Sequence, residues 1–436
     1  MNRNSSQPLT DFFKLTPLVW VTALMFSPDT LILLGNLAGG AGDFLVGMII
    51  IIGTFQILNA KSYNALARIY PQPAGEALFF KSIFGPLPAA VLSLISRLVF
   101  TVCAATGMLV ASGFAFNEIF LYWFPNFAFA FILLGVILAI NLLGEDIAQK
   151  AQIAFVVTAV SGIILLSFAG LAGTGTVSTP VEAHHPALNM RNWASVCLLF
   201  AGFDLVYLNR PSKDVKRFNP YNYMVIGIIS AGVLLGLWGL MSLKFVASHK
   251  LADTTIPHLI VARKILGQPG RIIMGIVIIT GTCGAVNALF RGVSQITVGL
   301  AKERLLPAFF ARNAKRAPLP LVVLTVTTAL MMALGMAGAD ELDVYIRAGL
   351  LFWLLCYAML HLAFLLARRH EDFSASLEYF PHPLVNSVAI FLLAVVSVLI
   401  YTDSEALLLI KFMVLMSAVI LFLVFIGMRL TKNISF

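Results

Sequence analysis

The chain has 436 residues, of which 60% are hydrophobic and only 11% are charged, a balance that excludes an ordinary soluble globular domain and is typical of a polytopic membrane protein. The polar first 16 residues contain no short apolar stretch with a cleavage site, so no removable signal peptide is expected. The formal net charge of +9 could indicate nucleic-acid binding, but the placement of the basic residues argues against it.

Twelve segments are apolar and long enough to cross a bilayer, which takes about 20 residues in a helix. They lie at 17–38, 44–66, 86–114, 127–143, 151–172, 192–210, 221–247, 271–300, 320–338, 343–366, 384–401 and 406–428. Lys and Arg concentrate in alternate loops, such as those containing Arg68 and Lys302, whereas Asp43 and Glu118 lie in loops between them. The positive-inside rule therefore predicts cytoplasmic termini, with the bilayer and not nucleic acid as partner. The expected location is a plasma membrane, specifically a bacterial inner membrane.

The first span has a polar centre, "SPDT" at 27–30. Pro28 removes a helix hydrogen-bond donor, and the carboxylate of Asp29 is costly in hydrocarbon. The sixth span has a similar centre, Ala201-Gly202-Phe203-Asp204, and because it lies five spans later it would cross in the opposite direction. Matched breaks of this kind predict a five-plus-five inverted repeat that binds substrate between the broken helices. The alternative is that Pro28 makes a simple kink and Asp29 hydrogen-bonds a neighbouring helix.

Other polar residues in the spans leave several interpretations open. Arg97 and Arg291 could each pair with Asp29 or Asp204, or could anchor an anionic substrate group. Lys244 and Arg347 lie nearer the ends of their spans and are expected to extend to the membrane surface. The four cysteines are expected to be small core residues. The pair at 184–185, two histidines without a third ligand nearby, predicts a solvated loop and no metal site.

Three stretches resemble the amino acid–polyamine–organocation permeases. "ARIYPQPAGEALFFKSIFGP" at 67–86 is similar to the loop after the family's second helix, and "FAGFD" at 200–204 is similar to its FxGFE motif. The run ending "LLPAFFARNAKRAPLP" at 305–320 is similar to the stretch that follows its eighth helix. The resemblance implies a LeuT-like all-α fold of 12 transmembrane helices with helices 1 and 6 broken. It would have cytoplasmic tails at 1–16 and 429–436, a transport core at 17–366 with repeats 17–172 and 192–366, and two additional helices at 384–428.

The first span departs from the family where the substrate carboxylate would be expected. The family's Gly-Ser-Gly falls on Ser27-Pro28-Asp29, in which Pro28 has no N–H to donate. Asp29 would repel a carboxylate by ~4 kcal/mol at ~4 Å and an effective dielectric constant of ~20. We therefore expect Asp29 to bind a cationic amino group. The alternative is an amino acid permease in which a buried arginine neutralises Asp29.

The resemblance and the breaks together identify the candidate site. Phe200 and Phe203 are the candidate gating residues and could stack over an ammonium; Asp204 and Asp29 are the candidate proton carriers. The lysine that some proton-coupled members carry in the fifth span is absent near Ser161. The expected substrate-binding residues are Ser27, Asp29, Thr30, Ala201, Gly202, Phe203, Asp204 and Arg291.

These features predict a secondary active transporter for an amino acid or organic amine, working by alternating access. Coupling to protons or exchange is expected, with sodium as the alternative ion, and no cofactor or metal is expected. An enzyme or membrane sensor is the remote alternative, because the chain has no phosphate-binding loop, HExxH motif or nucleophile elbow.

Overall fold

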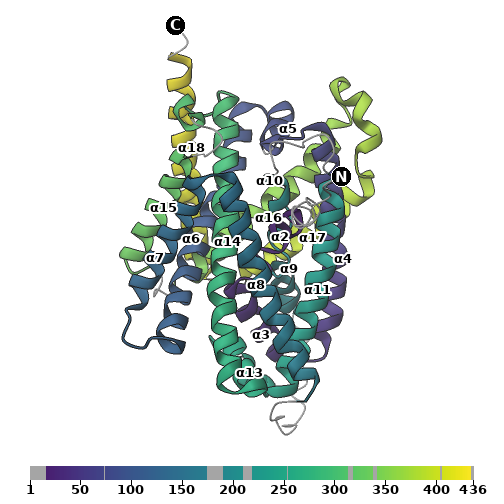
Figure 1. The fold of residues 1–436 in the computed structure, drawn as a ribbon. Helices are drawn as coiled ribbons and strands as arrows, with labels where there is room; N and C mark the ends of the chain where they lie inside the picture. The colour runs from purple at the N-terminus through teal and green to yellow at the C-terminus, as the bar shows by residue number, and fades with distance from the viewer. Residues whose placement is uncertain are drawn as a thin grey trace, which may run out of the picture.

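The structure is a computed structural model that describes residues 16–72, 74–173, 190–209, 219–252, 254–312, 318–336, 341–402 and 405–433. Throughout these ranges the regular structure is helical (Figure 1). The expected N-terminal tail up to residue 15, the histidine pair at 184–185 and the basic loop at 210–218 lie outside the described residues.

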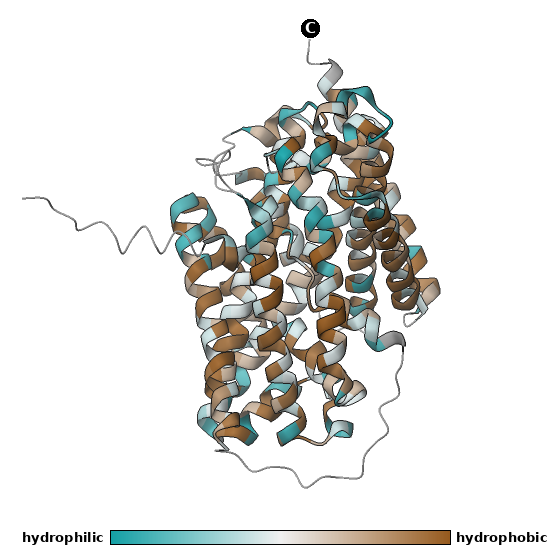
Figure 2. Ribbon diagram, turned by 90° about the vertical axis from the view of Figure 1, so that its right-hand side faces the viewer, coloured by the Kyte–Doolittle hydropathy of each residue, from teal (hydrophilic) through white to brown (hydrophobic). Residues whose placement is uncertain are grey.

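Nine helices in the described ranges are long and apolar enough to span a membrane, which makes the chain a multi-pass membrane protein. Hydrophobic residues predominate along the central part of these helices, while hydrophilic residues are more frequent toward the two ends of the bundle (Figure 2). They are α4 (Phe44–Ile69), α6 (Pro86–Ile119), α7 (Asn126–Leu143), α8 (Glu145–Leu171), α11 (Pro220–Phe245), α14 (Gln268–Lys302), α16 (Glu341–Ala367), α17 (Pro383–Thr402) and α18 (Ala406–Asn433).

The remaining three predicted spans are shorter or divided. The ninth corresponds to α15 (Pro318–Ala333), a shorter apolar helix. The first is divided into α2 (Thr16–Thr22) and α3 (Pro28–Ala41), and the sixth into α9 (Met190–Leu198) and α10 (Leu205–Leu208). The first interruption lies at 23–27, just before most of the polar centre predicted at 27–30, and the second lies at 199–204, where the sequence predicted the centre at 201–204.

The first interruption begins earlier than expected because Pro28 starts a helix instead of breaking one. Proline is favourable at the first helical position, where its missing N–H would have no helical partner. Ser27 caps α3 by accepting a hydrogen bond from the Thr30 N–H at 3.4 Å. The same arrangement recurs at α11, where Asn219 caps the helix and Pro220 follows it.

Short helices connect the spans at the two ends of the bundle. One end carries α5 (Gly75–Phe84) and η3 (Glu371–Tyr379), and the opposite end carries α13 (Pro257–Leu266) (Figure 1). The other short elements are α12 (Ser248–Ala252) and the 3-10 helix η1 (Ala308–Ala311).

The long helix α6 lies inside the bundle, in contact with α14, α16, α7 and α5, while α8 also packs on α14. The two divided segments pack on each other in a crossed order, since α2 contacts α10 and α3 contacts α9. The first half of one segment therefore meets the second half of the other, as in two antiparallel chains. This order brings the two interruptions together inside the bundle.

Candidate functional site

The first interruption is stabilised by hydrogen bonds to a backbone carbonyl, that of Leu24, which has no partner within a helix. The Leu24 carbonyl accepts from the Ser27 N–H at 3.1 Å and from the Thr30 hydroxyl at 2.8 Å. Side chains and turns can satisfy backbone groups in this way where a helix is interrupted. Ser27 and Thr30 thus have a structural task in addition to the substrate contact expected of them.

The second interruption depends on a glycine in a left-handed backbone conformation. Gly202 has φ +88°, and a Cβ at this position would lie 3.0 Å from the Cβ of Leu24. The two interruptions are therefore in direct contact. On the opposite side the backbone of the first one passes close to α14, where a Cβ on Gly281 would lie 2.6 Å from the Phe26 carbonyl oxygen.

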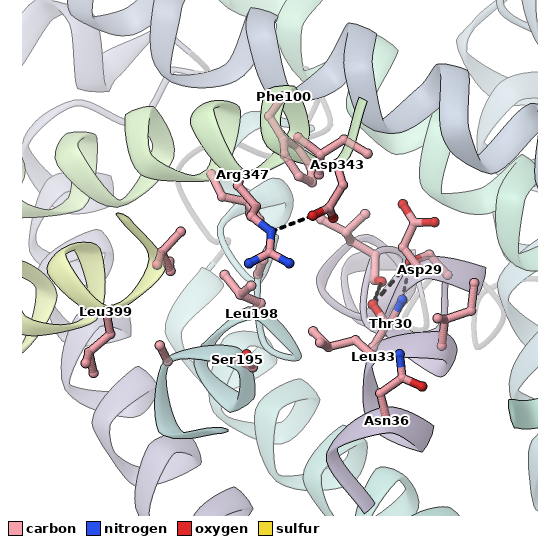
Figure 3. A pocket seen from close by; sticks show the side chains of 18 residues that line it. Asp29, Thr30, Leu33, Asn36, Phe100, Ser195, Leu198, Asp343, Arg347 and Leu399 are labelled. Carbon is pink, nitrogen blue, oxygen red and sulfur yellow. Dashed lines mark hydrogen bonds and ion pairs between the residues drawn. The ribbon is translucent and has the colours of Figure 1, made fainter. Parts of the chain in front are cut away.

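A pocket of about 360 Å³ lies where the two interruptions meet (Figure 3). Both contribute to its wall, with Ser27, Asp29 and Thr30 from the first and Ala201 from the second. Asp29 is the second residue of α3 and its side chain is partly exposed. Four of the expected substrate-binding residues therefore line one cavity, although Ala201 lies far from the other three in the sequence.

The sequence reasoning missed a charged pair on the same pocket wall. Asp343 and Arg347 on α16 line the pocket, and the Arg347 Nε lies 2.7 Å from the Asp343 carboxylate (Figure 3). Arg347 was expected to extend to the membrane surface; the structure places its side chain on the pocket wall, where it is 30% exposed. The i,i+4 spacing of the two residues was the available signal.

Asp204 does not line this pocket, because it belongs to a buried ionic cluster. One terminal nitrogen of Arg97 lies 2.6 Å from Asp204 and 3.4 Å from Glu76, and the three side chains are at most 6% exposed. The partner that the sequence left open for Arg97 is thus Asp204. Glu76 belongs to the motif at 67–86, and its contact with Arg97 was not expected from the sequence.

Aromatic and sulfur-containing side chains complete the cluster. The Tyr357 hydroxyl donates to Asp204 at 2.7 Å, and the Tyr63 hydroxyl donates to Glu76 at 3.2 Å. The thiol of Cys356 donates to the other carboxylate oxygen of Glu76. Phe203 packs between Tyr63 and Tyr357, with ring centroids 5.9 and 5.3 Å away. Its gating role stays a prediction.

The other predicted residues lie elsewhere. Phe200 lines an apolar hollow between α4 and α11. Arg291 on α14 lies 3.9 Å from Glu145 and over the Trp20 ring, away from the residues that line the pocket at Asp29.

The long side chain of Lys244 reaches back to the Gly170 carbonyl at 2.9 Å. All four cysteines are buried and free, as expected. In the described ranges no three His, Cys, Asp or Glu side chains gather as metal ligands would.

A buried polar network lies beside the cluster. The two ring nitrogens of His361 face amide oxygens of Asn386 and Asn59 at 2.9 and 3.0 Å. Asn59 in turn donates to Gln56, which donates to Cys197 on α9. This chain of contacts connects α16 and α17 with the helix that precedes the second interruption.

The fold and the site define a class: a helical multi-pass membrane protein with a pocket, lined in part by charged side chains, where two helices are interrupted. The family model described as amino acid permease matches residues 13–428, nearly the whole chain. The chain belongs to this family, and it is therefore a transporter and not an enzyme.

A similar curated protein is the uncharacterized protein MJ0609 of Methanocaldococcus jannaschii. The two are 24% identical over 286 residues, which cover 63% of this chain and 64% of the relative. The match thus spans less than two thirds of the relative's length, and its name indicates no substrate.

Proposed function

We propose that this transporter carries an organic amine or amino acid whose positively charged amino group binds Asp29. The observation that carries the proposal is the position of this carboxylate, on the wall of a 360 Å³ pocket formed by both interruptions. Small-molecule sites generally have volumes of about 300–1,000 Å³. A carboxylate exposed to a cavity inside a membrane protein needs a positively charged partner, and a substrate amine can be that partner.

The backbone at the start of α3 also favours an amine over a carboxylate at this place. A helix N-terminus binds anions through its free N–H groups. Here the Ser27 N–H donates to Leu24, the Thr30 N–H donates to the Ser27 hydroxyl, and Pro28 has none. Only the Asp29 N–H is left in this turn, directly beside the negative charge of its own side chain.

The two arginines that could have neutralised Asp29 have other partners. Arg97 is bonded to Asp204 and Glu76, and Arg291 lies nearest to Glu145. These contacts weigh against the alternative in which a buried arginine neutralises Asp29. The charged residues of the pocket wall are Asp29, Asp343 and Arg347, with a formal sum of −1, which favours a ligand with net positive charge.

An amino acid remains the second candidate because Arg347 lies on the same wall as Asp29. A zwitterion could place its amino group at Asp29 and its carboxylate near Arg347. In this arrangement the carboxylate would bind a side chain of α16 instead of the backbone of α3.

The proposed architecture is the LeuT-like one: twelve crossing segments, with the core at 17–366 built from repeats 17–172 and 192–366. Its supports are the antiparallel contacts of α2 with α10 and of α3 with α9, and the two interruptions in matching positions. With cytoplasmic termini in a plasma membrane, the α13 end of the bundle is external. In that orientation the pocket, which includes Asn36 and Asp343 on its wall, would open to the outside, and Phe203 with the Arg97 cluster would separate it from the cytoplasm. Alternating access would open this side while closing the other.

Counterflow into proteoliposomes tests the transport activity. The purified chain would be reconstituted with a panel of labelled amino acids and amines that includes norvaline and cadaverine. We expect accumulation of at least one compound with a free amino group and none of simple carboxylates. Failure of every amine and amino acid to give counterflow, in protein that is shown to be folded, would overturn the proposal.

Binding to a matched set of ligands tests the role of Asp29. Butylamine is norvaline without its carboxyl group, and pentanoate is norvaline without its amino group. In Asp29→Asn we expect butylamine to lose about 1.5–3 kcal/mol, the usual size of a hydrogen bond to a charged group, or roughly ten- to a hundredfold in affinity. Pentanoate should not bind more weakly than before. Unchanged butylamine affinity in this variant would exclude Asp29 as the amine site.

A further inference from the structure

The buried cluster around Arg97 contains more negative than positive charge. Arg97 is one cation, Asp204 and Glu76 are two potential anions, and none is more than 6% exposed. Ionised together, they would leave one negative charge uncompensated in the interior, where isolated charges are strongly unfavourable. The cluster is neutral when one of the two carboxyl groups holds a proton.

The contacts distinguish the two carboxyl groups. Asp204 lies 2.6 Å from Arg97 and also accepts a 2.7 Å hydrogen bond from Tyr357, both of which stabilise its ionised form. Glu76 lies 3.4 Å from the same arginine nitrogen and 3.2 Å from the Tyr63 hydroxyl. Its third donor is the thiol of Cys356, and a thiol is a weak hydrogen-bond donor. Because its contacts with the arginine and with a tyrosine hydroxyl are longer than those of Asp204, Glu76 is the carboxyl group whose ionised form is less stabilised.

We propose that Glu76 is a proton-binding site of this transporter. When the proton is bound, Glu76 is neutral and Arg97 pairs with Asp204 alone. When it is released, Arg97 is shared between α5 and the second interruption, where Asp204 precedes α10. Protonation thus changes how the interruption is tied to α5. This inference rests on the proposed function, since it assigns the coupling ion and its first carrier.

The surroundings of Glu76 agree with this assignment. Four titratable side chains face it from other elements: Tyr63 on α4, Arg97 on α6, Cys356 on α16, and Asp204. Burial raises the pKa of the Glu76 carboxyl above its ordinary value, even though Arg97 and the Cys356 thiol act in the opposite direction. On α16, Tyr357 follows Cys356 and donates to Asp204, whereas His361, one turn further on, is hydrogen-bonded to Asn59 and Asn386 and not to the cluster.

Thermal unfolding of the purified full-length protein tests the site without any substrate. A raised pKa means that the native state holds this proton more tightly than the unfolded chain, whose glutamates titrate near ~4.3. Stability should therefore fall as pH rises from that value through the native pKa. We expect Glu76→Gln, which mimics the protonated form, to flatten this dependence and to keep the wild-type midpoint measured at acidic pH.

Asp204→Asn is the matched control. Removing the closest partner of Arg97 should lower the midpoint at every pH. A wild-type pH dependence in Glu76→Gln would overturn the proposal. So would the reverse pattern, in which Asp204→Asn keeps the midpoint and flattens the dependence, since that would place the proton on Asp204.

Proton movement during transport is the second measurement. Proteoliposomes with a trapped pH dye would receive norvaline or cadaverine as probe, alongside counterflow of the same compound. We expect Glu76→Gln to retain counterflow and to lose substrate-driven proton movement. Unchanged proton movement in this variant would contradict the assignment. If neither probe nor any other amine gives counterflow in the wild type, the proposed function is wrong. The unfolding experiment, which needs no substrate, still tests whether Glu76 binds the proton.

Discussion

Asp29 and Arg347 bring opposite charges to the same pocket from two different helices. Asp29 is the second residue of α3, follows the Ser27 cap and Pro28, and lines the pocket. Arg347 is held by Asp343 one turn earlier on α16, at 2.7 Å. Selectivity between an amine and an amino acid should therefore depend on which of these two side chains the ligand reaches.

At Arg347 we predict a selective loss. Arg347→Gln should weaken norvaline by about 1.5–3 kcal/mol if the carboxylate binds the guanidinium, while butylamine should bind as well as before. Competition binding on the purified protein measures both. Arg271→Gln is a suitable control, because Arg271 also pairs with an acidic residue, Glu118, but lies away from the residues that line the pocket. Equal losses for both ligands in Arg347→Gln would show that the residue acts on the fold and not on the carboxylate.

At the scale of the structural elements, the two interruptions pack against each other. Leu24 of the first lies against Gly202 of the second, and this contact leaves no room for a larger residue. The carbonyl of Leu24 is meanwhile bonded by Ser27 and Thr30. The interrupted backbone is thus stabilised locally by hydrogen bonds within the chain.

A substitution at Gly202 should expose this dependence. Gly202→Ala forces a side chain into a left-handed conformation, which costs about 1–2 kcal/mol, before any clash with Leu24 is counted. We expect a lower unfolding midpoint in detergent and weaker ligand binding. Gly135→Ala on α7 is the control, since nothing lies within 4 Å of its added Cβ and its helical backbone tolerates alanine. Equal midpoints in the two variants would argue that the second interruption is not strained by a side chain.

On the scale of the whole molecule, the pocket and the ionic cluster lie one after the other along the length of the bundle. The cluster includes Glu76 at the start of α5, which marks one end, whereas the pocket includes the first turns of α16 from the other end. A closed cluster beside a pocket is the arrangement that alternating access requires of one state. The direction of this state depends on the membrane orientation.

Orientation can be measured with single cysteines and a membrane-impermeant maleimide. Tyr122 is 86% exposed in the connection between α6 and α7, and Glu378 is exposed on η3 at the opposite end. The four native cysteines are buried, so the background should be low. We expect Tyr122→Cys to react in intact cells and Glu378→Cys to react only after permeabilisation. The opposite result would invert the proposed topology and turn the pocket toward the cytoplasm.

The sequence by itself determined the class of the protein, because hydropathy over about 20 residues is a local property that sums without reference to neighbours. It also located both interruptions to within a few residues, since proline and glycine act on the backbone where they stand. Its interpretation of Pro28 was incomplete: proline can start a helix as well as break one, and the Ser27 cap decides which.

Only the tertiary structure decided which charges meet. Arg97 could have paired with either aspartate, and it lies against Asp204 because α6 packs beside the second interruption, with Glu76 brought in by α5. Arg347 lies on the pocket wall because α3 and α16, which are far apart in the sequence, both contribute residues to that pocket. Ion pairs depend on distances of a few ångströms across helices that are far apart in sequence, and no pattern along one chain contains those distances. The same reason separates Asp29, which the sequence placed at the site, from Asp204, which packing withdrew into the cluster.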